Sequence, residues 1–179
     1  MTEPEAPAMR HDADPISAAF PDVEVPVGGT AIDPLGPNLW STAGEVKLTG
    51  AKVTYELSGA AGVRITPSEQ GGGECENPST VRVVCTDPRV LSFEGETIEA
   101  YLPVVVKANR TAEVGDTGTV AVTFSADGIA PISGVSEVRV IDGRESLPIT
   151  GPGPGLTGAA VLSLGVLCVL VARRRAPLR

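Results

Sequence analysis

A five-residue peptide near the carboxyl end of the chain has residue types that suit binding in an extended conformation: Leu147, Pro148, Ile149, Thr150 and Gly151. Pro148 fixes its own φ and favours an extended conformation at the preceding residue, so the peptide enters a binding groove already partly ordered. Leu147 offers an apolar anchor for such a groove. The bond between Thr150 and Gly151 has little steric cover on its glycine side. These features suit a peptide that binds in the groove of another protein.

A charge-free apolar run follows this peptide after a hinge of glycines and prolines. It covers 17 residues, 156–172, and as a helix it would be about 26 Å long. A bilayer core is about 30 Å thick, and flanking arginines can snorkel to make up the difference. Arg173, Arg174 and Arg175 come next, and the positive-inside rule places them in the cytoplasm as a stop-transfer signal. We therefore expect a transmembrane helix at 156–172, a basic cytoplasmic tail at 173–179, and an extracellular location for everything before residue 156.

This order of peptide, membrane segment and cationic stop resembles the cell-wall sorting signal of the LPXTG type in Gram-positive surface proteins. The resemblance covers only the tail of the chain, and it implies that the chain is the substrate of a sortase. In that family a cysteine thiolate attacks the carbonyl of the residue that corresponds to Thr150 and forms an acyl-enzyme. An amine of a cell-wall precursor then resolves the thioester. Thr150 would become attached to peptidoglycan, and the part from Gly151 onward would stay in the membrane.

The resemblance also implies a location and a role. We expect a membrane-inserted precursor and a mature protein in the cell wall, on the extracellular face of a Gram-positive, actinobacterial cell. The mature protein would be a non-catalytic module that serves adhesion, display or spacing, with an unidentified surface ligand. Two alternatives stay open. The chain could be an uncleaved single-pass membrane protein that displays the same extracellular domain, or a small extracellular enzyme.

The composition favours a β-rich domain and excludes nucleic acid as a partner. The chain has 179 residues, which allow one ordinary domain with tails, and aromatic residues make up only 3%. Abundant Val, Thr, Gly and Pro favour strands joined by short turns. Removing the four arginines after Thr150 leaves 10 basic against 22 acidic residues, a net charge of −12. Binding to phosphate backbones requires a basic surface, so this acidic part does not suit nucleic acid.

The first residues conflict with export. A signal peptide needs a basic start and an apolar core of about 7–15 residues, whereas the segment that follows Met1 is rich in proline, alanine and acids. We expect residues 1–19 to form a disordered linker. We also expect the biological start to lie upstream, or the chain to be the C-terminal part of a longer surface protein.

Residues 20–142 alternate apolar and polar side chains in short runs broken by turn residues, which is typical of an all-β sandwich. Each run can bury one side only, so two sheets must pack together. Pro103 cannot donate to a ladder, so the long run at 97–107 should be an edge strand or be bulged there. We expect about seven to eight strands. The clearest faces comprise Val53, Tyr55 and Leu57, then Val81, Val83 and Cys85, then Val120, Val122 and Phe124; further strands are expected at 22–27, 45–49, 63–66, 90–93 and 135–141.

The stretch 53–140 looks like the Ig-like repeat domains of bacterial surface proteins. In those domains a cysteine pair brackets a short hairpin, and a Gly-Glu-Thr turn and a long valine strand follow; here the matching parts are Cys75, Cys85, 95–97 and 101–107. The resemblance implies an Ig-like β-sandwich. Trp40 precedes both cysteines, so the chain departs from the arrangement of antibody domains, where a buried tryptophan lies between them.

Cys75 and Cys85 are the expected disulfide, because such a pair oxidises outside the cytoplasm. A disulfide that closes so short a loop should stabilise the fold by about 2–3 kcal/mol in the chain-entropy description.

We expect no metal or cofactor, since a zinc site would need two further ligands and the only histidine, His11, lies in the linker. Calcium is disfavoured because no loop carries three spaced acids. We expect no catalytic residue: the glutamates at 94, 96 and 99 suit a solvated face, and the glycines at 71–73 suit a flexible loop.

Overall fold

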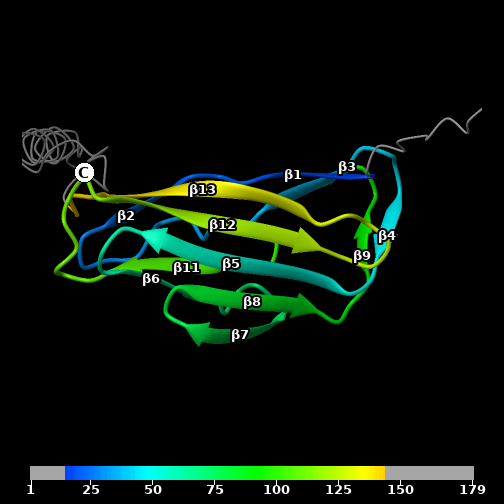
Figure 1. Ribbon diagram of the computed structural model, residues 1–179. Helices are drawn as coiled ribbons and strands as arrows, with labels where there is room; N and C mark the ends of the chain where they lie inside the picture. Colours follow the sequence, from blue (N-terminus) through cyan, green and yellow to red (C-terminus); the bar gives the residue numbers. More distant parts are fainter. Residues whose placement is uncertain (1–14, 144–179) are drawn as a thin grey trace, which may run out of the picture. The chain divides into compact units, whose positions relative to one another are not determined.

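The computed structural model describes residues 15–143, and these residues form strands and no helix (Figure 1). The chain divides into two units, Met1–Ser146 and Leu147–Arg179, and every described residue lies in the first. Nothing in the described part is a helix that could cross a membrane; the expected span at 156–172 and tail at 173–179 lie outside it. The strands are β1 (Ile16–Ala19), β2 (Val23–Pro26), β3 (Asn38–Ser41), β4 (Val46–Leu48), β5 (Ala51–Gly59), β6 (Val63–Pro67), β7 (Glu74–Ser79), β8 (Arg82–Asp87), β9 (Leu91–Phe93), β10 (Thr97–Ile98), β11 (Val104–Ala108), β12 (Thr117–Ser125) and β13 (Ile132–Ile141).

One layer of the domain is a six-stranded sheet in the order β2-β13-β12-β5-β8-β7 (Figure 1). Neighbouring strands are antiparallel except for β2 and β13, which run parallel. Along β5, buried and exposed positions alternate from Ala51 to Leu57, as the pleat of a strand with one covered face requires. The same alternation runs along β12. This sheet therefore buries one face and leaves the other in water.

The second layer lies behind this sheet and is built from shorter pieces. β3 pairs with β1 on one side and with β10 on the other. The chain before β3 continues the same ladder along β11, through bridges from Leu35 to Val104 and from Thr30 to Lys107. β11 then pairs with β6. The second layer thus has the order β1, then β3 with the segment before it, then β10 and β11, then β6.

The core lies between the two layers. The largest fully buried side chains come from both: Tyr55, Phe124, Val53 and Val83 from the six-stranded sheet, and Leu35, Leu39, Ile65, Val104 and Val106 from the other layer. A buried polar bond crosses the core, since the Tyr55 hydroxyl donates to the carbonyl oxygen of Leu102 at 2.9 Å. Tyr101 meets the ring of Phe124 edge to face, with centroids 6.1 Å apart.

The all-β class predicted from the alternation is confirmed, and so are the buried faces of β5 and β12. Val83 and Cys85 are buried as expected, but Val81 is 43% exposed and precedes β8 in the turn. That turn reverses the chain between β7 and β8, so Val81 no longer shares the pleat of the residues that follow it. The expectation for Val81 was wrong.

The long strand expected at 97–107 is broken into β10 and β11. Ala100 and Leu102 both adopt a left-handed φ of 45°, which an extended strand does not allow. The break lets the chain leave its pairing with β3 and move to its pairing with β6. Breaks of this kind, with short pairings such as β4 with β9, explain why the described part has thirteen strands where the sequence predicted about seven to eight.

The expected boundary between the disordered linker, 1–19, and the folded domain lies four residues too far along the chain. β1 occupies Ile16–Ala19, inside the segment assigned to a disordered linker, and Ile16 is only 2% exposed. The strand forms because it pairs with β3 from Ile16 to Ala19. Nothing is described of residues 1–14.

Tyr55→Phe tests the bond that crosses the core. The substitution leaves the buried carbonyl of Leu102 without its hydroxyl partner, so the free energy of unfolding should fall by about 1–2 kcal/mol. Denaturant unfolding of the two proteins measures the difference. Ser133→Ala is the matched control, because the Ser133 hydroxyl pairs with Thr123 on the exposed face and its loss should change stability by less than about 0.5 kcal/mol. Equal losses for the two variants would contradict a role for the buried bond.

Candidate functional site

The predicted sorting peptide, 147–151, and Arg173, Arg174 and Arg175 lie outside the described residues, so the attachment at Thr150 stays a prediction. The domain that precedes them is described up to residue 143. Its last strand, β13, ends at Ile141, six positions before Leu147. The peptide therefore follows the last strand of the domain after a short connection.

Cys75 and Cys85 are joined in a disulfide, with an S–S distance of 2.04 Å and Cα atoms 4.1 Å apart. They are direct partners in the ladder between β7 and β8. Cys85 is fully buried, while Cys75 lies on the outermost strand of the six-stranded sheet and is half-buried. The bond fixes β7, which has a single neighbour in that sheet, to the body of the domain.

Of the glutamates considered for acid–base chemistry, Glu94 and Glu96 lie in the turn between β9 and β10, and Glu99 follows β10. Glu94, Glu96 and Glu99 are all exposed, and the Glu96 carboxylate accepts a hydrogen bond from the Glu94 backbone N–H at 3.1 Å. This is the solvated arrangement that the sequence predicted.

The glycine run at 71–73 has a packing role that the sequence did not reveal. A Cβ at Gly73 would overlap the Leu102 side chain and the Thr86 carbonyl oxygen. The chain can pass between these groups only without a side chain at this position. The run is therefore partly a close-packed segment and not only a flexible loop.

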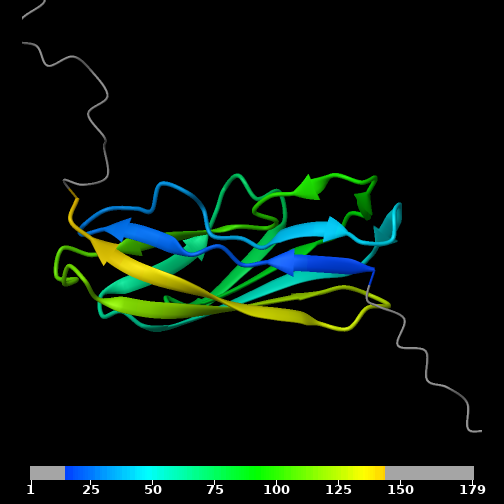
Figure 2. The same cartoon turned by 90° about the horizontal axis from the view of Figure 1, so that it is seen from above.

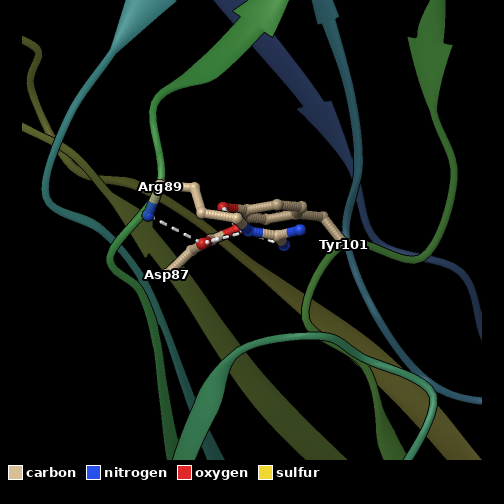
Figure 3. A network of polar contacts seen from close by, with 3 residues as sticks. All are labelled: Asp87, Arg89 and Tyr101. Carbon is tan, nitrogen blue, oxygen red and sulfur yellow. Dashed lines mark hydrogen bonds and ion pairs between the residues drawn. The ribbon is translucent and has the colours of Figure 1, made fainter.

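A network of Asp87, Arg89 and Tyr101 lies where β8 ends (Figure 3). The Asp87 carboxylate accepts from the Arg89 backbone N–H at 3.0 Å, from its Nε at 2.9 Å and from its Nη2 at 2.9 Å. The Tyr101 hydroxyl donates to the same carboxylate at 3.2 Å. The bond to the backbone two residues ahead is an Asx turn, which an aspartate forms readily. Asp87 itself is only 4% exposed.

The charges of this network shift its proton affinities. Hydrogen bonds from Arg89 lower the pKa of Asp87 and outweigh the opposing effect of its burial. Burial raises the pKa of Tyr101, and the neighbouring Asp87 charge raises it further. Burial alone raises the pKa of Tyr55. Asp87 is thus an ionised and fully engaged carboxylate, which suits a structural clamp better than a proton-transfer group.

The network of Asp87, Arg89 and Tyr101 joins β8 to the segment at 99–103, which crosses from the pairing with β3 to the pairing with β6. Sequence reasoning missed it, although Asp87-Pro88-Arg89 is a local signal for the Asx turn. No local signal indicates Tyr101, which is fourteen positions away and arrives through the fold.

A hollow of about 750 Å³ lies on the described surface, at the end of the domain where β13 finishes. Two exposed apolar side chains line it, Ile32 at 72% and Val114 at 63% exposure. Its charged lining consists of Asp22, Glu24, Asp33 and Arg139. Within residues 15–143, His, Cys, Asp and Glu side chains form no group of three or more that could hold a metal ion. The hollow therefore combines apolar and mainly acidic groups on one open surface.

Comparison with known proteins gives no family for this chain: no family model matches it, and no curated protein matches it. Among solved structures it is similar to a family 123 glycoside hydrolase from Clostridium perfringens, at 15% identity and a TM-score of 0.31, over 66% of this chain and 22% of that one. It is also similar to the collagen binding subdomain of the Enterococcus faecalis surface protein ACE, at 8% identity and a TM-score of 0.31, over 70% of this chain and 96% of that one. The chain spans about a fifth of the hydrolase chain it matches. Likeness at these TM-scores establishes neither the fold nor the function.

Asp87→Asn tests the Asp87 network through the pH dependence of the free energy of unfolding. The folded pKa of Asp87 is depressed, so its stabilising effect is complete above the unfolded carboxyl pKa, about 4, and disappears as pH falls through the lower folded value. At neutral pH the variant should lose about 1–2 kcal/mol of unfolding free energy. Urea unfolding between neutral pH and about pH 2 should show the two proteins converging at the acidic end. A difference that stays constant with pH would contradict an ionised Asp87.

Reduction of the disulfide should lower the free energy of unfolding by about 2–3 kcal/mol, since the bond closes a short loop in the unfolded chain. Denaturant unfolding with and without a thiol reductant measures the loss. The double variant Cys75→Ala/Cys85→Ala is the control, because its stability should not respond to the reductant. An unmodified protein that is equally stable in both buffers would refute this contribution.

Proposed function

We propose that this chain is a non-catalytic cell-surface module that a sortase joins to peptidoglycan through Thr150. The observation that carries the proposal is the order of the tail: the peptide 147–151, the apolar run 156–172 and the three arginines that follow it. A plain membrane anchor requires the last two features and no particular peptide before them. The sortase and peptidoglycan are the proposed partners, and the membrane holds the precursor until the cut.

The described domain supports this proposal in two ways. Its last strand ends six positions before Leu147, so attachment at Thr150 would hold the folded domain close to the wall polymer. The Cys75–Cys85 disulfide suits an oxidising location outside the cytoplasm. We accordingly assign the mature module to the cell wall, on the extracellular face of a Gram-positive cell.

We also propose that the domain is an Ig-like sandwich. An immunoglobulin constant-type domain has strands A, B, E and D in one sheet and C, F and G in the other. The order β1, β3, β10 with β11, and β6 matches the first set, and β13-β12-β5 matches the second in reverse order. The hairpin of β7 and β8, which carries the disulfide, is an addition on the free edge of β5.

Spacing or display is the role that the described ends of the domain favour. β1 begins at one end of the domain, and β13 finishes at the other (Figures 1 and 2). A domain entered at one end and left at the other adds its full length to a chain. Adhesion is a second candidate role, favoured by the exposed Ile32 and Val114 in the hollow near β13, because exposed apolar groups that gather in one place mark contact surfaces.

Thr150→Ala tests the proposed attachment. The protein is expressed behind a secretion signal in a Gram-positive host that carries a sortase. The unmodified protein should be released by muramidase and resist detergent. The variant keeps a backbone carbonyl at position 150 but lacks the threonine side chain of the proposed sorting peptide, so a sortase should no longer accept it and the protein should move to the membrane fraction or the medium.

Thr157→Ala is the matched control, since it changes a threonine seven positions further along, outside the peptide, and should leave wall attachment intact. Unchanged wall attachment of Thr150→Ala would refute the proposed site. Detergent release of the unmodified chain would favour the uncleaved membrane protein instead.

A further inference from the structure

A strand near the start of the described domain lies beside its last strand. β2 is the second strand from the N-terminal side, and β13 is the last strand. They pair in parallel from Val23 with Val138 to Pro26 with Ile141. The ladder continues one step further, because the Val27 N–H donates to the Ile141 carbonyl oxygen at 3.0 Å. Figure 2 shows both strands pointing toward the same end of the domain.

Parallel pairing sets the direction in which a pull on the chain ends loads these bonds. The N-terminal side of β2 leads back through β1 to one end of the domain, while the C-terminal end of β13 faces the other end (Figure 2). A force between the ends draws β2 and β13 in opposite directions along their own axes. The bonds between them then carry the load together, and they must fail together. Strands pulled apart from one end would instead lose their bonds one at a time.

The neighbouring pairings are loaded in the same way. β1 is bonded to β3 from Ile16 to Ala19, and a pull on residue 15 draws it along β3. On its other side β13 is bonded to β12 from Thr117 to Phe124, and a pull on residue 143 draws it along β12. An end-to-end force therefore loads each of these pairings along the strand axes. None of them can lose its hydrogen bonds one at a time before the terminal strands slide.

Burial protects the bonds of β2 and β13 from water that could replace them. Val25 and Val138 are fully buried, and Val140 is 1% exposed. Sliding one strand past the other would move these side chains out of the packed core, which costs free energy in addition to the hydrogen bonds. The hairpin of β7 and β8 with its disulfide lies at the opposite edge of the same sheet and takes no part in this path.

We propose that the domain is a load-bearing element, in which the parallel pair β2 and β13 forms a shear clamp against tension applied between residues 15 and 143. The function proposed above supplies the source of the tension, since a module fixed to the wall at Thr150 is pulled by whatever holds its other end. The clamp itself depends only on the fold. A force measurement on the purified protein therefore tests it separately from wall attachment.

The test is single-molecule force spectroscopy on the full chain in detergent, held by a tag at each end. Val25→Ala and Val83→Ala are matched variants, because both remove the same atoms from a fully buried valine. Val25 lies in the clamp, and Val83 lies on β8 outside it. Denaturant unfolding first establishes the equilibrium loss of each. At equal loss, Val25→Ala should lower the end-to-end rupture force and Val83→Ala should leave it nearly unchanged, because forced unfolding reports the unfolding barrier and not the equilibrium. Equal reductions would overturn the proposal.

A change of pulling direction keeps the test decisive if Val25→Ala fails to fold. The connection between β12 and β13 lies at the end of the domain where β1 begins (Figure 2). Ala130 belongs to this connection and is exposed. Ala130→Cys offers a second attachment point. Pulling between the N-terminal tag and residue 130 opens the strands from one end, so the bonds fail one at a time and the rupture force should be clearly lower than in end-to-end pulling. Equal rupture forces in the two pulling directions would overturn the proposal.

Discussion

The burial of one face of each sheet against the other is the interaction on which the rest of the structure depends. Only one side of β5 and of β12 is apolar, so neither can be covered without a second layer. The second layer is made of short strands, and by itself it would expose Leu35, Leu39 and Ile65, which the core buries completely. Each layer therefore needs the other. The disulfide and the Asp87 network add stability at an edge and at a crossing of a fold that apolar burial has already set.

The segment at 99–103 shows how this constraint shapes the chain. It must leave β3 and reach β6 while it keeps its apolar side chains in the core, and left-handed residues at Ala100 and Leu102 accomplish the turn. Two hydroxyl groups then hold it. Tyr55 donates to the Leu102 carbonyl oxygen, and Tyr101 donates to Asp87. An unfavourable backbone conformation persists here because polar bonds and packing from both layers surround it.

The sequence predicted those parts of the fold that local patterns determine. Alternation identified β5, β12 and the second half of β13, because a half-buried strand repeats every two residues. It missed β1 and β3. β1 consists of Ile-Ser-Ala-Ala, which shows no clear alternation and becomes a strand through its pairing with β3. The Asp87 network was equally hidden, since Tyr101 reaches Asp87 only through the tertiary fold. The tail is the opposite case, because its interpretation rests on the linear order of peptide, span and arginines and needs no tertiary information.

We propose that a tail which is cut and covalently transferred at Thr150 follows the two-layer domain, which the chain enters at one end and leaves at the other. The central claim is that the mature protein ends at Thr150. Mass spectrometry of the native protein, released from purified walls by muramidase, tests this claim most directly. The account predicts a C-terminal peptide that ends at Thr150 and carries a peptidoglycan fragment on its carbonyl. A C-terminal peptide that continues through Gly151 into the apolar run would contradict it.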